Sequence, residues 1–311
     1  MFKKKYYSFV RKNPFLHKTI KFFISPLIKR EKRSSIITKI ASDYSNKFFG
    51  EIKELRVKEE RKKYYSNISI IILNYNNKDI VDKCIDSILN FNKNYNCKVV
   101  VVDNQSTDGS FEILQTKYRG DITLLRNEKN GCASGRNLGV SSVNTEYLIF
   151  LDSDQWVLHE NWIDPFIEIF KEKEISAIGW AGGWLGPTGQ ASLSVDDMPN
   201  RYEPENNLYR SDIDYIGSGG MMMKTSLFNK IGGFDTNYDP TAYEDTDISF
   251  KIKNVGGKIV YSPYLGIGHL PHQTTKDGSK EHFERMKKNG EYFAKKWERL
   301  NPQLFESLVK N

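Results

Sequence analysis

Two aspartates separated by one residue follow a strongly apolar stretch in the middle of the chain. Asp152, Ser153 and Asp154 come directly after residues 147–151, which read Tyr-Leu-Ile-Phe-Leu. Carboxylates at positions i and i+2, where a buried strand opens into a loop, are hard oxygen ligands that suit Mn²⁺ or Mg²⁺. Such an ion can bridge a diphosphate and offset the charge on a departing nucleotide. Alone the pair is a weak signal, because turns also favour aspartate.

Similar polar clusters follow three other apolar runs. The four clusters occupy residues 74–77, 103–108, 127–131 and 152–154. Ligands of parallel α/β sheets bind beyond the carboxyl ends of the strands. Four such clusters in succession therefore predict one ligand site along a single edge of a sheet.

The elements that must position these clusters alternate between strand and helix from residue 67 onward. Strands are expected at 68–73, 99–102, 122–125 and 147–151, and helices at 78–90, 109–118 and 132–142. This alternation predicts an α/β fold with a doubly wound, mostly parallel sheet. Later, residues 221–223 are expected to form a buried strand. Residues 279–298 are expected to form a helix that Gly290 could interrupt.

Five short motifs occur in a fixed order along the chain. They are 69–76 (SIIILNYN), 101–109 (VVDNQSTDG), Asn130-Gly131 with 136–139 (RNLG), 151–154 (LDSD), and 232–235 (GGFD) with 243–247 (YEDTD). Together they resemble the family 2 glycosyltransferases of the GT-A fold, which has a Rossmann-like sheet. The resemblance covers residues 68 to about 272. It implies a GT-A domain at 66–275. Residues 1–65 lie outside the resemblance, and their residue pattern predicts a basic helical extension; a C-terminal helical segment is expected at 276–311.

The resemblance implies that the loops after the first two strands bind a nucleotide-sugar donor. Tyr75 and Asp103 match the positions that hold the base, and the Asp103 carboxylate could accept from the N–H of uracil or thymine. Arg136 matches a position near the diphosphate, where a guanidinium suits phosphate oxygens. Each of these residues has an alternative role. Tyr75 could be an ordinary packing residue, Asp103 could stabilise a turn, and Arg136 could form a surface ion pair. The predicted donor-binding residues are Asn74, Tyr75, Asn76, Asp103, Asn130, Gly131, Arg136, Asp152 and Ser153.

Glu244 and Asp245 match the acidic pair that supplies the catalytic base in the family. An inverting transfer needs a carboxylate to take the proton from the acceptor hydroxyl. Asp245 is the predicted base and Glu244 the alternate, although either could cap the helix expected to begin there. The predicted metal ligands are Asp152, Asp154 and His269. His269 is included because some GT-A enzymes take a third ligand from a late histidine, although a lone histidine is more often structural.

Aromatic and glycine residues beyond position 175 resemble the acceptor side of the family. Trp180 and Trp184 offer faces that could stack on a sugar, although tryptophan is as often a core residue. Gly219 and Gly220 belong to a glycine-rich run that permits close approach of the backbone to a ligand. The same run could instead be a simple turn.

The basic charge of the chain is concentrated at its N-terminus. Residues 1–65 contain 19 Lys and Arg against 6 Asp and Glu, whereas the whole chain has a net charge of +7. Apolar clusters interleaved with lysines predict a helical hairpin packed on the main domain or a segment on an anionic membrane surface, and a nucleic-acid-binding arm is the minor alternative. Self-association into a homo-oligomer stays open. No nucleic-acid partner is expected for the acidic remainder of the chain.

Cysteine usage and hydropathy suggest where the protein works. The 3 cysteines form no CxxC pair, as in a reducing compartment, and no apolar run is long enough to span a bilayer. A cytoplasmic location is expected. If residues 1–65 bind a membrane surface, the protein would attach peripherally to the inner face of the plasma membrane.

The sequence as a whole predicts a metal-dependent, inverting glycosyltransferase. The expected donor is a UDP-sugar, with dTDP-rhamnose and GDP-sugars open. The expected acceptor is a glycan, a lipid-linked molecule or a protein in bacterial surface polysaccharide or glycoconjugate synthesis. A nucleotidyltransferase is the first alternative, but residues 74–78 contain no glycine of the kind that cradles phosphates. A non-catalytic carbohydrate-binding protein with a degenerate transferase fold is the second, and the intact acidic motifs argue against it.

Overall fold

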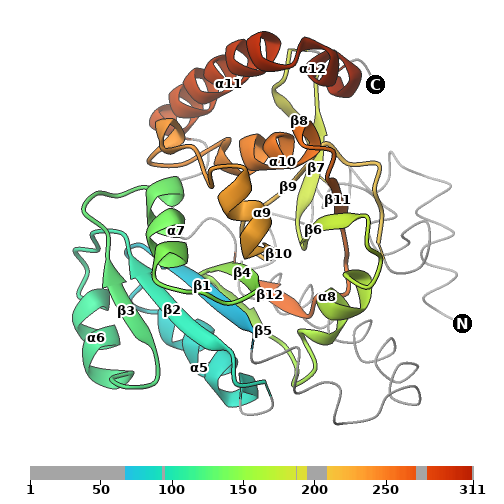
Figure 1. Cartoon of the computed structure of the whole chain (residues 1–311). Coiled ribbons are helices and arrows are strands. Elements are labelled where there is room, and N and C mark those ends of the chain that lie inside the picture. The colour runs from blue at the N-terminus through green and yellow to red at the C-terminus, as the bar shows by residue number, and fades with distance from the viewer. Residues whose placement is uncertain (1–66, 93–94, 187, 195–208, 271–278, 310–311) are drawn as a thin grey trace, which may run out of the picture.

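A seven-stranded sheet forms the centre of the protein (Figure 1). The computed structural model describes residues 67–92, 95–186, 188–194, 209–270 and 279–309, so the expected extension at 1–65 lies outside the described residues. Across the sheet, the strands are β11 (Lys258–Tyr261), β6 (Ile175–Gly179), β10 (Met221–Lys224), β4 (Tyr147–Asp152), β1 (Ile68–Asn74), β2 (Lys98–Asp103) and β3 (Thr123–Arg126).

The central strands run parallel and are buried on both faces. β1 pairs in parallel with β2 and β4, and β2 pairs in parallel with β3. All seven residues of β1 are buried, which explains why this strand is an unbroken apolar run rather than an alternating one. β10 is antiparallel to both β4 and β6. The predicted α/β fold with a mostly parallel sheet is therefore confirmed.

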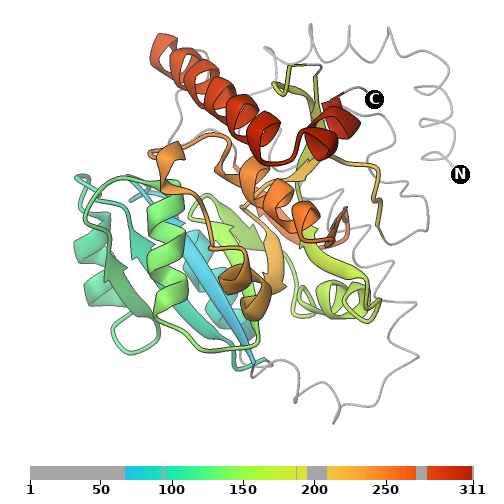
Figure 2. The same ribbon diagram turned by 45° about the horizontal axis from the view of Figure 1, so that its top comes forward.

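Alternate residues of β1 face two separate hydrophobic cores. Ile70 and Ile72 pack toward α5 (Val81–Asn92), α6 (Ser110–Lys117) and α8 (Asp164–Ile169). Ile71 and Leu73 pack toward α7 (Cys132–Ser141), α9 (Thr225–Lys230) and α10 (Glu244–Asn254). The two helical layers are visible on either side of the sheet in Figure 2. This arrangement follows from the period-2 alternation of side chains along a strand.

Two smaller sheets lie beside the main one. β5 (Gln155–Val157) pairs antiparallel with β12 (Ile267–His269), and this pairing places His269 opposite Gln155. β7 (Gly182–Leu185) lies between β8 (Ala191–Ser194) and β9 (Tyr215–Ile216). The first pair therefore brings a late histidine back to the segment that follows the Asp152–Asp154 motif.

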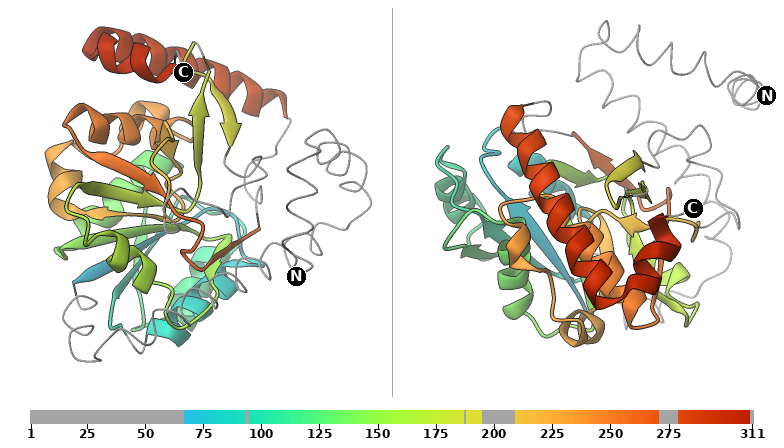
Figure 3. Two further views of the ribbon diagram at one scale, coloured as in Figure 1. Left: turned by 90° about the vertical axis from the view of Figure 1, so that its right-hand side faces the viewer. Right: turned by 90° about the horizontal axis from the view of Figure 1, so that it is seen from above.

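Two C-terminal helices cover α10 (Figure 3). Phe293 and Trp297 of α11 (Lys280–Leu300) pack with Phe250 of α10 and with Phe305 of α12 (Pro302–Val309). α11 continues unbroken through Gly290, because burial of its aromatic face outweighs the roughly 1 kcal/mol by which glycine disfavours a helix. Within the described part of the chain, no helix combines the length and the apolarity needed to cross a bilayer.

Candidate active site

The predicted polar loops meet at one edge of the sheet. The amide of Asn104 donates to Asn74 O at 2.8 Å, and the amide of Ser153 donates to Leu73 O at 3.0 Å. The amide of Asn127 donates to Asp103 O at 2.8 Å. These hydrogen bonds extend the parallel pairing just beyond the strand ends, so the loops after β1, β2, β3 and β4 leave the sheet side by side.

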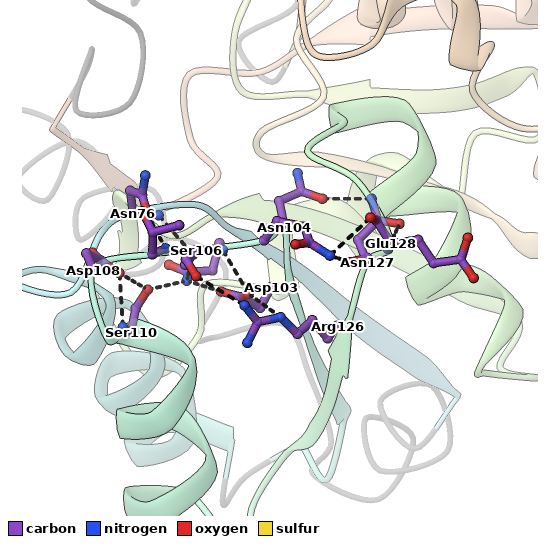
Figure 4. A network of polar contacts seen from close by, with 12 residues as sticks. Asn76, Asp103, Asn104, Ser106, Asp108, Ser110, Arg126, Asn127 and Glu128 are labelled. Carbon is purple, nitrogen blue, oxygen red and sulfur yellow. Dashed lines mark hydrogen bonds and ion pairs between the residues drawn. The ribbon is translucent and has the colours of Figure 1, made fainter.

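Asp103 is held inside a network formed by the loops after β1 and β2 (Figure 4). It is fully buried, and its Oδ1 and Oδ2 accept hydrogen bonds from Asn74 Nδ2 and the Ser106 amide, both at 3.1 Å. Asn76 Oδ1 accepts from the Thr107 amide at 2.8 Å. Both asparagines thus join the two loops, and Asn74 also orients the Asp103 carboxylate. Tyr75, between them in the chain, is partly exposed.

The start of α7 is joined to the same network. Asn104 Nδ2 donates to Gly131 O at 3.1 Å, and its Oδ1 accepts from Asn127 Nδ2 at 2.9 Å. Asn130, directly before Gly131, is partly exposed. The loop after β3 is therefore fixed relative to the Asp103 network, and α7 starts from a defined position.

Arg136 on α7 connects two acidic motifs that are far apart in sequence. Its side chain is 3% exposed, and its Nη2 donates to Asp152 Oδ1 at 2.6 Å. Its Nη1 lies 3.4 Å from Glu244 Oε1. Burial alone would lower the pKa of Arg136, but the two carboxylates, Asp152 foremost, raise the pKa above its ordinary value. The guanidinium therefore stays charged and bridges β4 to α10.

Burial raises the pKa of both carboxyl groups at the start of α10. Glu244 is 5% exposed, and burial raises its pKa to about 7, with help from Asp245 and against the effect of Arg136. Partial burial also raises the pKa of Asp245, although the Thr246 amide, 2.7 Å from Asp245 Oδ1, opposes the shift. A carboxyl group whose pKa lies near the working pH suits a general base.

The turn before this pair has an unfavourable backbone conformation. Ala242 and Tyr243 have φ angles of 85° and 72°, in the left-handed region that non-glycine residues seldom occupy. Each such residue costs of the order of 1–3 kcal/mol unless surrounding contacts stabilise it. Tyr243 is buried, with its ring 5.6 Å from that of Phe293 on α11. The position of Glu244 therefore depends on packing outside α10.

The predicted metal ligands fall into two adjacent groups. His269 Nε2 lies 3.4 Å from Asp154 Oδ1, while the Asp152 carboxylate faces Arg136. Gly219 lies so close to Asp152 that a Cβ there would come within 2.5 Å of Asp152 Oδ2. Among the described residues, no three side chains of the His, Cys, Asp or Glu type converge into a complete metal site. The available donors, two carboxylates and an imidazole, still match the preferences of Mn²⁺.

The predicted acceptor residues differ in environment. Trp180 is buried, its ring lies edge-on 5.8 Å from that of His269, and its amide donates to Gly220 O at 3.2 Å. Trp184 is partly exposed, its Nε1 donates to Asp212 O, and the Arg210 guanidinium lies 5.0 Å from its ring. Trp180 thus packs behind His269, whereas Trp184 retains accessible surface.

Two residues of the site were missed from the sequence. Gln155 Oε1 accepts from the Asp152 amide at 3.0 Å, and Asp239 Oδ1 accepts from the Ala133 amide at 3.0 Å. Asp239 therefore caps α7 although it lies more than 100 positions later in the chain. Its only sequence signal is that it precedes a proline, which predicts a turn rather than a cap for a distant helix.

Comparison with known proteins identifies the family. Residues 69–232, more than half of the 311-residue chain, match the model of glycosyl transferase family 2. The chain belongs to this family. The predicted resemblance is confirmed, and the match spans the Asp152 motif and Arg136 but ends before Glu244.

Its relatives are glycosyltransferases from diverse organisms. The mouse polypeptide N-acetylgalactosaminyltransferase 12 is 29% identical over 172 residues, which cover 48% of this chain and 29% of the mouse protein. The poly(ribitol-phosphate) beta-glucosyltransferase of Bacillus spizizenii is 33% identical over 95 residues, which cover 29% of this chain and 15% of that enzyme. The matches thus span less than a third of either relative.

Two solved structures share the GT-A fold that the sequence predicted. The mannosyltransferase PcManGT of Pyrobaculum calidifontis, in complex with GDP-Man and Mn²⁺, has a TM-score of 0.57 and 17% identity. That match covers 88% of this chain and 80% of PcManGT. GalNAc-T7 with UDP, GalNAc and Mn²⁺ has a TM-score of 0.52 and 19% identity, covering 65% of this chain and 43% of GalNAc-T7.

The buried ion pairs predict how Glu244 titrates. Arg136→Met should raise the pKa of Glu244 above about 7, because the nearby guanidinium favours the ionised carboxylate. Infrared titration of the carboxyl bands, with Glu244→Gln used to assign the signal, measures this shift. Arg126→Met, which removes an arginine from the Asp103 network, is the matched control and should leave the Glu244 signal in place. Titration of Glu244 near its ordinary value of 4.5 in the unmodified protein would contradict the electrostatic interpretation.

Proposed function

We propose that the protein is an inverting glycosyltransferase that moves a sugar from a nucleoside diphosphate to a hydroxyl group. The observation that carries the proposal is the bridge from Asp152 through Arg136 to Glu244. It joins residues suited to the leaving diphosphate with residues suited to activating the acceptor. Release of a nucleoside diphosphate from a sugar nucleotide tests the proposal, whereas a nucleotidyltransferase would release pyrophosphate from a nucleoside triphosphate.

The proposed donor is a UDP-sugar. Asp103 is oriented by Asn74 and Ser106, and a carboxylate has further lone pairs that can accept from the imide N–H of uracil. Tyr75, partly exposed in the preceding loop, is the proposed stacking partner of the base. UDP should therefore stabilise the fold against heat more than GDP does, because a ligand that binds only the native state raises its stability. Stabilisation by GDP alone would redirect the assignment to GDP-sugars.

Asp152, Asp154 and His269 are the proposed holders of Mn²⁺ or Mg²⁺. When bound, such an ion would offset the charge of the leaving diphosphate as a Lewis acid. Asp154 suits this role because its Oδ1 is buried, accepts no hydrogen bond from the described residues, and lies 3.4 Å from His269 Nε2. Arg136 would direct its remaining N–H donors toward phosphate oxygens.

The residues at the start of α10 are proposed to prepare the acceptor. Asp245 is the more exposed member of the acidic pair and is not in an ion pair with Arg136, so its carboxylate is the proposed base. It would take the proton of the acceptor hydroxyl as that oxygen attacks the anomeric carbon. Glu244 would keep Arg136 in place. The exposed part of Trp184, with Gly219 and Gly220, is the proposed wall of the acceptor site.

The first prediction of this function concerns the metal ligands. Asp152→Asn and Asp154→Asn should each lose nearly all transfer activity while the fold persists, because support for the leaving diphosphate is worth several kcal/mol of barrier. A coupled assay of nucleoside diphosphate release, with and without EDTA and added Mn²⁺, measures the effect. Asp121→Ala, at an exposed position, should behave like the unmodified chain. Full activity in excess chelator would remove the metal from the proposal.

The second prediction concerns the base. Asp245→Asn should keep donor affinity and lower kcat by roughly 10²–10⁴-fold, the usual scale for a general base. Because the acidic pair must be ionised and its pKa is raised to about 7 at Glu244, activity should fall as pH drops through neutrality. Steady-state kinetics between pH 5 and 9 measure both effects. If Glu244→Gln abolished turnover and Asp245→Asn did not, Glu244 would be the base.

The proposed acceptor is a glycan, a lipid-linked molecule or a protein in bacterial surface polysaccharide or glycoconjugate synthesis. Residues 1–65 are proposed to hold the enzyme at the inner face of the plasma membrane through their 19 Lys and Arg, each worth about 1 kcal/mol near an anionic surface. The full chain should sediment with anionic vesicles at low salt and be released at high salt. Neutral vesicles are the control, and absence of binding at low salt would overturn the membrane role.

A further inference from the structure

A buried asparagine on α11 contacts the backbone just before the acidic pair. Asn289 is 3% exposed. Its Nδ2 donates to the carbonyl oxygens of Tyr238, Thr241 and Ala242 at 3.1, 3.0 and 3.0 Å. One side chain thus connects three carbonyl groups in the turn that leads into Glu244.

These contacts require a hydrogen-bond donor at position 289. Carbonyl oxygens accept hydrogen bonds only, so the nitrogen of the amide must face them. Alanine at position 289 would leave these buried or partly buried carbonyls without this donor, and aspartate would place a carboxylate oxygen against them. The turn includes Ala242 and Tyr243, whose left-handed backbone needs contacts from outside to persist.

α11 also contacts the chain on both sides of this turn. Lys296 Nζ lies 2.7 Å from Asp235, which precedes the turn, and 2.7 Å from Asp247, in the first turn of α10. Trp297 Nε1 donates to Asp247 Oδ1 at 2.9 Å. All four of these residues lie beyond residues 69–232, the region that matches the family model.

The two helices approach closely at the turn itself. A Cβ at Gly290 would come within 2.9 Å of the Tyr243 hydroxyl, so a larger residue would push α11 away from the turn. Figure 2 shows α11 lying over the start of α10. Helix, turn and acidic pair therefore form one packed unit.

We propose that α11 is a positioning element for Glu244 and Asp245, and that Asn289 is its main positioning residue. Asn289 acts through the backbone of residues 238–242 and fixes the direction in which α10 begins. The proposal rests on the proposed function in one respect, namely that the acidic pair activates the acceptor. It goes beyond that function by assigning a role to the C-terminal helix.

Asn289→Ala and Asn289→Asp test the proposal, with Asn301→Ala as the matched control. Asn301 ends α11 and donates to Asn254 at 2.7 Å, at the opposite end of α10 from Glu244. Both Asn289 variants should lower kcat tenfold or more, because displacing a catalytic group by about 1 Å can cost on the order of 10²-fold. Donor KM should change less than kcat, since the carbonyls of Thr241 and Ala242 lie directly before the acidic pair, whereas the turn reaches the donor side through the start of α7. Asn301→Ala should keep the kcat of the unmodified chain.

Hydrogen exchange supplies a readout that does not depend on turnover. The amide of Cys132 donates to Pro240 O at 2.8 Å and that of Asp247 donates to Tyr243 O at 2.9 Å, so both report on the turn. These amides should exchange faster in Asn289→Ala, while those of β1 stay protected.

The possible failures are distinguishable. If the unmodified enzyme is active and both Asn289 variants retain its kcat, or if the turn amides keep their protection, the positioning role is wrong. Equal loss of kcat in Asn301→Ala would reduce Asn289 to a general stabiliser and overturn the proposal. If the unmodified chain releases no nucleotide from any sugar nucleotide, the proposed function fails first, and the catalytic role of Asn289 fails with it.

Discussion

A buried guanidinium must be paired, and this constraint organises the site. Arg136 is supplied by α7, and its partners Asp152 and Glu244 come from the end of β4 and the start of α10. Removing one partner of a buried ion pair costs about 3–5 kcal/mol, because a charge is then left without compensation in a poorly solvated place. The three elements are therefore constrained to meet, although more than 100 positions separate Arg136 from Glu244.

Several neighbouring elements hold Arg136, Asp152 and Glu244 in position. The parallel pairing of β4, β1 and β2 aligns their carboxyl ends, and Asp239 caps α7, which carries Arg136. Gly219 allows the backbone to approach Asp152 where any side chain would collide with it. On the other side, α11 packs against the strained turn before Glu244. The proposed donor half of the site thus depends on the sheet, whereas the proposed acceptor half depends on helix packing.

The sequence predicted the sheet because its strands are buried on both faces. The strand expected at 68–73 is β1 (Ile68–Asn74), and the helix expected at 132–142 is α7 (Cys132–Ser141). Local periodicity contains this information. It does not contain the partner of a side chain, so the sequence predicted Asn74 as a donor-binding residue without indicating that it is fully buried and donates to Asp103.

Sequence patterns did not predict the contacts between segments that are distant in the chain. Asn289 lies in an amphipathic helix. The periodicity of that helix indicates which face is buried, but it does not predict that Asn289 donates to three backbone carbonyl groups. Gly290 suggested a break, yet α11 continues through it, and a Cβ at this position would lie 2.9 Å from the Tyr243 hydroxyl. The motif residues around Glu244 were recognisable, whereas the packing that orients them required the structure.

The stereochemistry of transfer tests the central claim most directly. If the acidic pair at the start of α10 activates the acceptor for a single in-line displacement, the anomeric configuration of the transferred sugar must invert. Proton NMR of the product, recorded before mutarotation or with a blocked reducing end, reports the configuration through the coupling of the anomeric proton. Inversion relative to the donor is the predicted result, and a product with the donor's own configuration would contradict the mechanism.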